Sequence, residues 1–395
     1  MRRVYLDHSA TTPVRPEVLE AMLPYLKENF GNASSIHSFG QDARRAVEEA
    51  REKTAQAIGA DPKEIVFTSG GTESDNLAIR GVALAKEKKG RHIITSAVEH
   101  HAVLDTCEQL EKQGFTVTRV GVDADGIVDP AEVESALRDD TILITIMHAN
   151  NEVGSIQPIA EISRLARERE ITFHVDAVQS LGKIPVKVDE LGIDLVSLSG
   201  HKIYGPKGTG ALYIRKGTKF KPLFHGGGQE RKLRPGTENV PGIVAFGRAV
   251  ELAVHELPEE ARRLEVLRDR LMDGLLQRIS ELKVNGSRIK RLPHNVNVSV
   301  IYVEGESLIL CLDMEGIAVS SGSACTSGSL EPSHVLRAMG IAHEVAHGSL
   351  RMTLGRDNTT EDVDYVLEKV PAIVERLRSM SPLYGHREGE TVVVQ

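Results

Sequence analysis

The chain contains no tryptophan and only three cysteines among its 395 residues. The cysteines are Cys107, Cys311 and Cys325, and no two of them form a C-x-x-C motif. A sparse, odd set of cysteines is not expected of a disulfide framework or of a structural zinc site. It favours a reducing compartment, and we therefore expect a cytoplasmic protein.

Long apolar runs and an excess of positive charge are also missing. No run approaches the roughly 18 apolar residues of a membrane-spanning helix, and residues 1–8 lack the apolar stretch of a signal peptide. Lys and Arg number 48 against 56 Asp and Glu, a net charge of −8, with both signs interspersed. We expect neither a membrane nor nucleic acid as a partner.

What the chain does contain is a regular alternation of short Val- and Ile-rich runs with longer helical patterns. This alternation predicts an α/β fold whose mostly parallel sheet is covered by helices on both faces. Such sheets bind ligands at the carboxyl ends of their strands. The predicted strands are residues 64–68, 92–96, 116–120, 142–147, 171–175, 195–198 and 210–214, and helices include 38–58, 75–88, 102–113 and 159–168.

The pattern changes near Pro258, where a charged amphipathic helix is predicted over residues 259–279. Strand-like runs at 295–303, 317–320 and 350–354 and a last helix at 360–380 follow, which is typical of a smaller α+β unit. We predict a large domain of residues 15–257 and a small domain of residues 1–14 and 258–395, which carries a loop at about 320–329.

Lys202 is the most informative residue. It lies in Ser197-Leu-Ser-Gly-His-Lys-Ile-Tyr-Gly-Pro-Lys-Gly208, directly after an apolar run that reads as a buried strand. A lysine at a strand end is well placed to be a reactive amine, which forms Schiff bases with carbonyls such as that of pyridoxal phosphate. A surface lysine beside a turn is the alternative, and the other motifs of the chain decide against it.

A phosphate site is predicted where Thr68-Ser-Gly-Gly-Thr-Glu-Ser-Asp-Asn76 follows a strand and opens a helix. Gly70 and Gly71 let the backbone approach an anion, Thr72 adds a hydroxyl, and the helix start offers free N–H groups. The spacing is not that of a Walker loop. An ordinary helix start is the alternative.

Two further strand ends carry candidate cofactor ligands. Asp176 ends a predicted strand, where a carboxylate can pair with a protonated pyridine nitrogen, and Gln179 could bind the ring hydroxyl. His100, in Glu99-His-His101, could stack on a flat ring. The alternatives are a helix-capping Asp and a polar loop His.

Cys325 and Arg351 are the candidate groups of the second unit. Cys325 lies in Ser320-Ser-Gly-Ser-Ala-Cys-Thr-Ser-Gly-Ser329, and a thiol on such a polar surface loop is available as a nucleophile once deprotonated. Arg351, in a strand-like run, could grip a substrate carboxylate with two hydrogen bonds. An incidental thiol and a surface ion pair are the alternatives. Cys107 and Cys311 are predicted to be core residues.

One motif points elsewhere. His343-Glu-Val-Ala-His347 has the H-E-x-x-H spacing of zinc proteases. Because Gly340 and Gly348 bracket it, a helix there is predicted to span about two turns. We therefore discount a zinc hydrolase and predict no metal site.

Taken together, eight segments carry a resemblance: residues 6–13, 68–76, 99–100, 150–154, 176–179, 199–202, 234–237 and 320–329. Over roughly residues 4–384 the chain resembles the cysteine desulfurases of the NifS/IscS group, within the class V aminotransferase family of fold-type I pyridoxal phosphate enzymes. The resemblance implies pyridoxal phosphate as cofactor and L-cysteine as substrate. It also implies a homodimer that passes sulfur to an iron–sulfur scaffold protein or another acceptor.

The resemblance also implies the role of each residue. Lys202 would bind the cofactor covalently and Cys325 would receive the sulfur, with His100 stacked on the ring. The other cofactor ligands would be Gly71, Thr72, Asn151, Asp176, Gln179, Ser199 and His201, with Thr237 reaching the partner subunit's cofactor. Arg351 and Asn32 would bind the substrate. Whether Cys325 also ligates an iron–sulfur cluster in a scaffold complex stays open.

Some positions differ from the common pattern. Gly71 stands where alanine is frequent. Glu170 stands where glycine is usual, and a left-handed turn there would strain Glu170 by about 1 kcal/mol. The alternatives are a selenocysteine lyase or an aminotransferase on the same fold, or a non-enzymatic sulfur carrier. The sulfur acceptor stays open among general iron–sulfur assembly, nitrogenase-specific assembly and tRNA thiolation.

Overall fold

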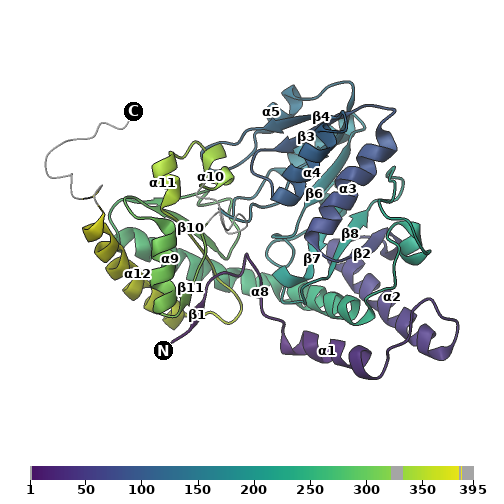
Figure 1. Cartoon of the computed structure of the whole chain (residues 1–395), viewed down its shortest axis with the longest axis horizontal. Helices are drawn as coiled ribbons and strands as arrows, with labels where there is room; N and C mark the ends of the chain where they lie inside the picture. Colours follow the sequence, from purple (N-terminus) through teal and green to yellow (C-terminus); the bar gives the residue numbers. More distant parts are fainter. Residues whose placement is uncertain (1, 322–331, 382–383, 385–395) are drawn as a thin grey trace.

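The computed structural model describes residues 2–321, 332–381 and 384, so Cys325 lies outside the described residues. Among the described residues no helix is both long and apolar enough to cross a bilayer. Figure 1 shows a sheet with its helices on one side of the molecule and a smaller group of strands and helices on the other.

The large sheet has seven strands in the order β2-β8-β7-β6-β5-β3-β4. All neighbours pair in parallel except β8, which is antiparallel to both β2 and β7. The sequence prediction of an α/β fold with a mostly parallel sheet is therefore confirmed. The strands are β2 (Ile65–Thr68), β3 (His92–Ser96), β4 (Thr116–Val120), β5 (Thr141–Thr145), β6 (Thr172–Asp176), β7 (Leu195–Ser199) and β8 (Gly210–Ile214).

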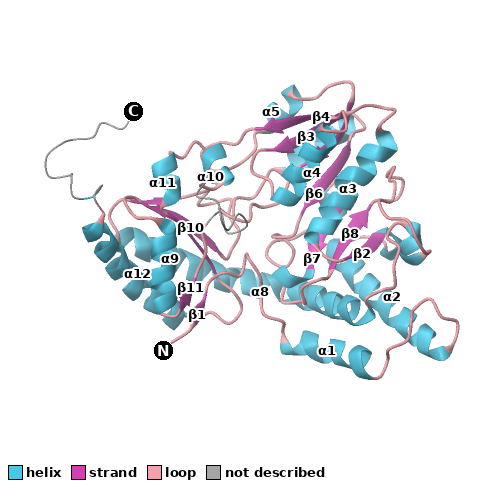
Figure 2. Cartoon of the chain, viewed as in Figure 1, coloured by secondary structure: helices cyan, strands magenta, loops and turns pink. Residues whose placement is uncertain are grey.

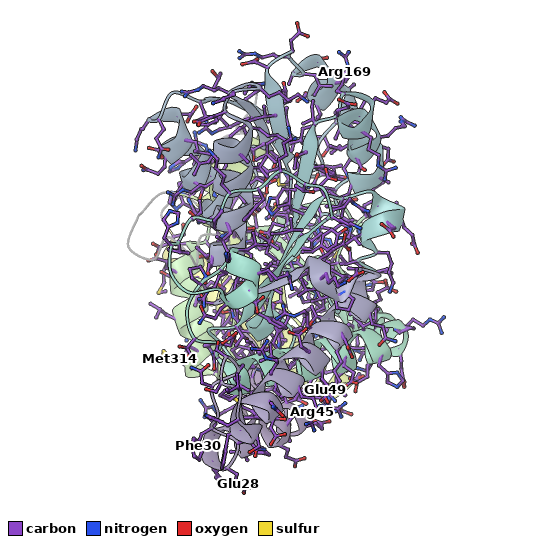
Figure 3. The ribbon with its side chains drawn as sticks, turned by 90° about the vertical axis from the view of Figure 1, so that its right-hand side faces the viewer. Glu28, Phe30, Arg45, Glu49, Arg169 and Met314 are labelled. Atoms are coloured by element: carbon purple, nitrogen blue, oxygen red, sulfur yellow. The ribbon has the colours of Figure 1, made fainter. Side chains whose placement is uncertain are left out.

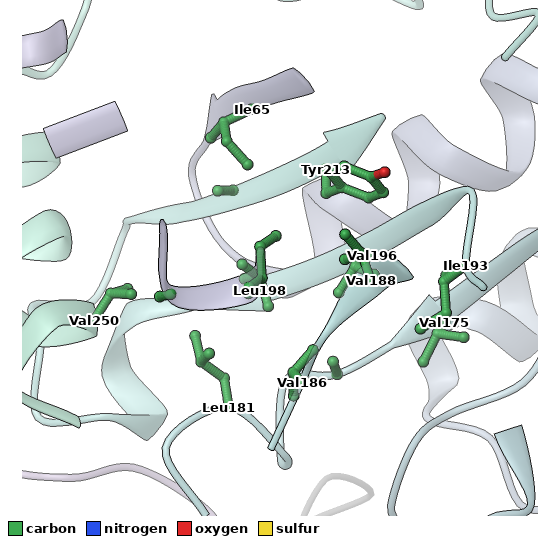
Figure 4. Close-up of a cluster of buried hydrophobic side chains, with 14 of the residues drawn as sticks. Ile65, Val175, Leu181, Val186, Val188, Ile193, Val196, Leu198, Tyr213 and Val250 are labelled. Atoms are coloured by element: carbon green, nitrogen blue, oxygen red, sulfur yellow. The ribbon is translucent and has the colours of Figure 1, made fainter. Parts of the chain in front are cut away.

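Both faces of this sheet are apolar because its strands alternate between two cores. In β7, Leu195 packs into one cluster, whereas Val196 and Leu198 pack into the other. Figure 4 shows Val196 and Leu198 of the second cluster together with Tyr213 and Val175. Helices cover both faces (Figure 2): α2 (Ser38–Ile58), α3 (Gly71–Lys86), α4 (His101–Glu111), α5 (Pro130–Ser135), α6 (Ile159–Glu168), α7 (Val188–Leu191) and the first part of α8 (Val240–Arg278).

The smaller group is built on an antiparallel sheet of order β12-β10-β9 and on a parallel pair of β1 with β11. A separate core joins these strands to α8, α9 and α12. The elements of the smaller group are β1 (Val4–Tyr5), β9 (Leu282–Val284), β10 (Asn295–Val300), α9 (Gly305–Met314), β11 (Ile317–Ala318), α10 (His334–Ala338), α11 (His343–His347), β12 (Ser349–Thr353) and α12 (Thr360–Met380).

The predicted helix at residues 259–279 is only the second half of the 39-residue α8, which starts at Val240. Pro258 lies inside this helix. Because proline lacks an N–H and is uncommon inside helices, the sequence predicted that the helix starts after Pro258. The predicted domain boundary at 257/258 thus falls within one continuous helix, and the division into two domains stays a prediction. Helices α1 (Pro16–Lys27) and α9 were not predicted.

Candidate active site

A cavity of about 300 Å³ lies where several strands of the large sheet end. Asp176 and Ser199 end β6 and β7, and Gly71 begins the helix after β2. Ten predicted site residues line the cavity: Gly71, Thr72, His100, Asn151, Asp176, Gln179, Ser199, His201, Lys202 and Arg351. Because parallel strands end at one edge, residues distant in the sequence meet there.

Lys202 is held by the N-terminal segment of the chain. It follows β7 on the short helical turn Gly200–Lys202, and its Nζ donates hydrogen bonds to Ser9 O at 2.6 Å and Ala10 O at 2.7 Å. Lys202 lines the same cavity as Arg351. An amine so placed can bind a carbonyl compound covalently or carry a proton.

One side of the cavity forms a cradle for an anion. Gly70 precedes α3 with φ 152°, a backbone conformation that side chains rarely adopt, and it leaves the helix without a side-chain cap. The first N–H groups of a helix have no intrahelical partner, so those of α3 are available to an anion. Ser199 Oγ is buried without a hydrogen-bond partner among the described residues. These donors, with Thr72 and His201, fit a phosphate group.

The floor of the cavity carries two buried acids. Asp176 Oδ1 accepts a hydrogen bond from Val178 N at 2.9 Å, and burial raises the pKa of Asp176 above its ordinary value. Asp75 lies beside Asp176. Burial, and then the negative charge of Asp176, raise the pKa of Asp75 well above its ordinary value. Buried carboxylates of this kind gain from a nearby cation, and a protonated pyridine nitrogen is one.

His100 is held as a neutral ring. It precedes α4, and its Nδ1 accepts a hydrogen bond from Ala102 N at 3.1 Å, which puts the ring hydrogen on Nε2. Burial and then the positive charge of Lys202 lower the pKa of His100 to about 4. A neutral imidazole that lines the cavity is compatible with stacking on an aromatic ring, and this role of His100 stays a prediction.

Arg351 lies on β12 and its side chain is only 3% exposed. Nη1 donates to Asn151 O at 3.1 Å, and Nη2 pairs with Asp7 Oδ1 at 3.0 Å. Its Nε is buried and has no hydrogen-bond partner among the described residues. Arg351 therefore lines the cavity with two of its nitrogens held by Asn151 and Asp7.

Two predicted site residues, Thr237 and Asn32, do not line this cavity. Thr237 lines a larger cavity of about 920 Å³, which it shares with Thr72. Asn32 is not among the residues that line the smaller cavity, and its Oδ1 accepts from Ser34 N. Phe30, close to Asn32 in the sequence, is 74% exposed at one end of the molecule (Figure 3). Cys325 is outside the described residues.

The other two cysteines differ from each other. Cys107 is buried in the core beside Leu110, as predicted, and burial raises its pKa to about 12. Cys311 is only partly buried against the small core. The prediction of a core position is therefore confirmed only in part for Cys311, which packs at the edge of the small core, whereas its neighbour Leu310 is 66% exposed.

The H-E-x-x-H segment forms α11, a helix of only five residues, which agrees with the short helix that the flanking glycines predicted. The rings of His343 and His347 pack edge to face with centroids 4.4 Å apart. Among the described residues no group of three His, Cys, Asp or Glu side chains is placed to hold a metal ion.

Five residues that line the cavity were not predicted as site residues from the sequence: Ser9, Ala10, Asp75, Met147 and Val178. For Asp75 a signal existed, because it lies one helical turn after Gly71 and Thr72 and so shares their face. Ser9 and Ala10 act through backbone carbonyls, which leave no mark in side-chain patterns.

The residues of the cavity fit pyridoxal phosphate. The anion cradle at Gly70 and Ser199 suits a phosphate, the buried acid Asp176 suits a ring nitrogen, and the amine of Lys202 suits a carbonyl. The unpartnered Ser199 Oγ is the clearest sign, because buried hydroxyl groups normally have a partner. The site thus has the form of a cofactor-dependent enzyme of fold-type I.

The chain belongs to the class V aminotransferase family, whose family model matches residues 4–366. The cysteine desulfurase IscS of Dictyoglomus turgidum is 61% identical over 381 residues, which cover 96% of this chain and 97% of that protein. The cysteine desulfurase IscS of Methanosarcina thermophila is 62% identical over 382 residues, or 97% of this chain and 94% of that one.

Solved structures agree in fold. A NifS-like protein superposes with a TM-score of 0.90 at 44% identity, covering 95% of this chain and 100% of that chain. SspA in complex with cysteine superposes with a TM-score of 0.78 at 40% identity, covering 89% of this chain and 98% of the other.

Proposed function

We propose that this chain is a cysteine desulfurase, which converts L-cysteine to L-alanine and leaves the sulfur as a persulfide on Cys325. The observation that carries the proposal is one cavity that holds the amine of Lys202, the guanidinium of Arg351 and the buried carboxylate of Asp176. The names of the relatives at 61% and 62% identity support the same activity.

Bound pyridoxal phosphate would supply an electron-withdrawing ring that stabilises negative charge on the substrate carbon. Lys202 would attach the cofactor and then move the proton of the substrate Cα. Asp176 would hold the ring nitrogen protonated, His100 would stack on the ring, and Asn151 and Gln179 would contact its hydroxyl side. Gly71, Thr72, Ser199 and His201 would bind the phosphate.

Arg351 would hold the substrate carboxylate and so fix the orientation of the bound amino acid. The thiolate of Cys325 would then attack the substrate sulfur. One C–S bond breaks as one S–S bond forms, and the carbon fragment takes up protons to leave as alanine. The net change is one thiol and one cysteine converted to one persulfide and one alanine.

The persulfide would pass to an acceptor, which we propose to be an iron–sulfur scaffold protein or a thiolation partner. We further propose a cytoplasmic homodimer in which Thr237 and Asn32 act at the partner subunit's site. The placement of both residues outside the cavity of their own chain supports this arrangement.

Product analysis tests the proposal. The purified protein with pyridoxal phosphate is given L-cysteine and a reducing agent, and alanine and sulfide are measured over time. The proposal predicts equal amounts of alanine and sulfide. Pyruvate with ammonia in place of alanine, or transfer of the amino group to an added keto acid, would assign the protein to another reaction of the family.

A further inference from the structure

The guanidinium of Arg351, which lines the candidate active site, already has a carboxylate partner, Asp7. Asp7 Oδ1 lies 3.0 Å from Arg351 Nη2, and the two side chains are 20% and 3% exposed. At this separation and burial the two charges largely neutralise each other. A substrate carboxylate that approaches Arg351 therefore meets a neutral pair and not an isolated cation.

Asp7 is fixed in this place by the backbone around it. Its carbonyl accepts hydrogen bonds from Ala10 N at 3.0 Å and from Tyr5 Oη at 3.0 Å. The preceding residue, Leu6, accepts from Thr353 N at 2.7 Å, so the segment is tied to β12, the strand that carries Arg351. The backbone of Asp7 is thus held beside β12, within reach of the Arg351 guanidinium.

The remaining donors of Arg351 decide how a ligand can bind. A guanidinium has five N–H donors, and the buried Nε of Arg351 has no partner among the described residues. A ligand carboxylate that reaches Arg351 from the cavity approaches a guanidinium whose Nη1 and Nη2 are already engaged by Asn151 and Asp7. The two carboxylates would then share one cation at close range, and their mutual repulsion lowers the affinity for the ligand.

A second acid near Arg351 is already engaged elsewhere. Glu152 is fully buried, and its carboxylate accepts a hydrogen bond from Ser333 Oγ. No hydrogen bond joins Glu152 to the guanidinium among the contacts of the described residues. Asp7 is therefore the acid that acts directly on Arg351.

We propose that Asp7 is the charge partner of Arg351 that weakens binding of carboxylate ligands, so that the site releases its amino-acid product readily and does not retain simple anions. This inference rests on the proposed function, because it takes the carboxylate of L-cysteine as the ligand of Arg351. Substrate and product carry the same carboxylate, so Asp7 weakens both alike.

Two fragments of cysteine test this role. Mercaptopropionate has the carboxylate and the thiol but no amine, whereas cysteamine has the amine and the thiol but no carboxylate. Their dissociation constants are measured by calorimetry on the pyridoxal phosphate-loaded protein and on its Asp7→Asn variant. We expect the variant to bind mercaptopropionate about tenfold more tightly, the scale of one unit charge removed a few ångström away at the edge of a protein site. Binding of cysteamine is expected to change little.

The matched control is Asp313→Asn, which removes the same charge from an exposed position on α9. It should change neither constant. Weaker binding of mercaptopropionate by Asp7→Asn would overturn the proposal, because it would mean that Asp7 only holds Arg351 in place. If Asp7→Asn does not fold, as judged by circular dichroism, Asp7→Ser carries the same expectation and decides. A wild-type protein that makes no alanine would refute the proposed function, while the fragment comparison would still report on Asp7.

Discussion

The Nζ of Lys202 and the carbonyl oxygen of Ser9 lie 2.6 Å apart, although 193 positions separate the two residues in the sequence. Gln179 Nε2 donates to the same carbonyl at 3.0 Å. The N-terminal segment reaches the site because β1 pairs with β11 and Leu6 bonds to Thr353. The smaller group of elements therefore contributes directly to the environment of the lysine.

Removal of that lysine should abolish the chemistry. In Lys202→Ala the cofactor has no amine to bind covalently, so we expect loss of its visible absorbance band from the dialysed protein. Alanine formation should fall by at least about a hundredfold, the lower range for a lost proton-transfer group. The control is Lys207→Ala, an exposed lysine in the following turn, which should retain both properties. A Lys202→Ala protein that keeps the band and the activity would refute the assignment.

Glu99 should make stability fall as the pH rises. It is fully buried, Oε2 has no partner among the described residues, and burial raises its pKa from 4.5 to about 8. Between these values the folded state holds a proton that the unfolded state has lost. The stabilising contribution is therefore complete below about pH 4.5 and is lost as the pH rises through about 8.

The slope from this one proton is up to about 1.4 kcal/mol per pH unit in that interval. Glu99→Gln cannot ionise, so its free energy of unfolding should fall less steeply than that of the wild type between pH 5 and 8. Urea titrations at several pH values measure both slopes. Because Glu152 and the other acids are present in both proteins, the difference reports Glu99. Parallel curves would show that Glu99 is ionised in the folded state.

Glu170 follows α6 with φ 53°, so the left-handed turn that the sequence predicted is present. A side chain in this conformation costs roughly 1 kcal/mol more than glycine. We therefore expect Glu170→Gly to increase the free energy of unfolding by about that amount. Glu168→Gly, two residues earlier within the helix, should instead reduce it by about 0.5–1 kcal/mol. Equal effects at both positions would contradict this explanation.

Gly71 is predicted to resist replacement by alanine. A Cβ at this position would lie 2.7 Å from Val178 Cγ2, so one of the two residues must move. Such overpacking costs about 1–3 kcal/mol, and the shift would fall in the wall of the cofactor cavity. Gly71→Ala should therefore weaken binding of pyridoxal phosphate, as measured by titration of the cofactor-free protein.

The double variant Gly71→Ala with Val178→Ala serves as its control. Removal of the valine methyl groups takes away the clash, so affinity for the cofactor should recover in part. If both variants bind equally weakly, the loss at Gly71 comes from another cause.

The sequence predicted the sheet correctly, and it indicated several residues that the fold brings into one cavity, because the responsible signals are local. Parallel strands are buried on both faces, so they read as short apolar runs, and the polar residues that follow them mark the site edge. Asp176 and Lys202 both follow this pattern, whereas the role of Ser199 was implied only by the resemblance to the family. The predicted strand ends differ from the observed ones by only a few residues.

What the sequence could not predict depends on long-range geometry. The pair of Asp7 and Arg351 joins two segments that are 344 positions apart, and it exists only because the N-terminal segment lies along β12. Likewise, only the folded chain shows that Thr237 and Asn32 lie outside the cavity of Lys202. Pro258 suggested that a new helix starts after it. The 39-residue helix α8 instead continues through Pro258, although proline lacks an N–H donor.

The most direct test of the account follows the sulfur atom itself. The pyridoxal phosphate-loaded protein is mixed with L-cysteine that carries an isotopic label on sulfur, in the absence of any reducing agent. Alanine is measured, and the peptide that contains Cys325 is examined by mass spectrometry. The account predicts one labelled sulfur atom on Cys325 for each alanine formed in the first turnover. Alanine formed at the normal rate with no label on Cys325, or with the label on Cys107 or Cys311, would contradict it.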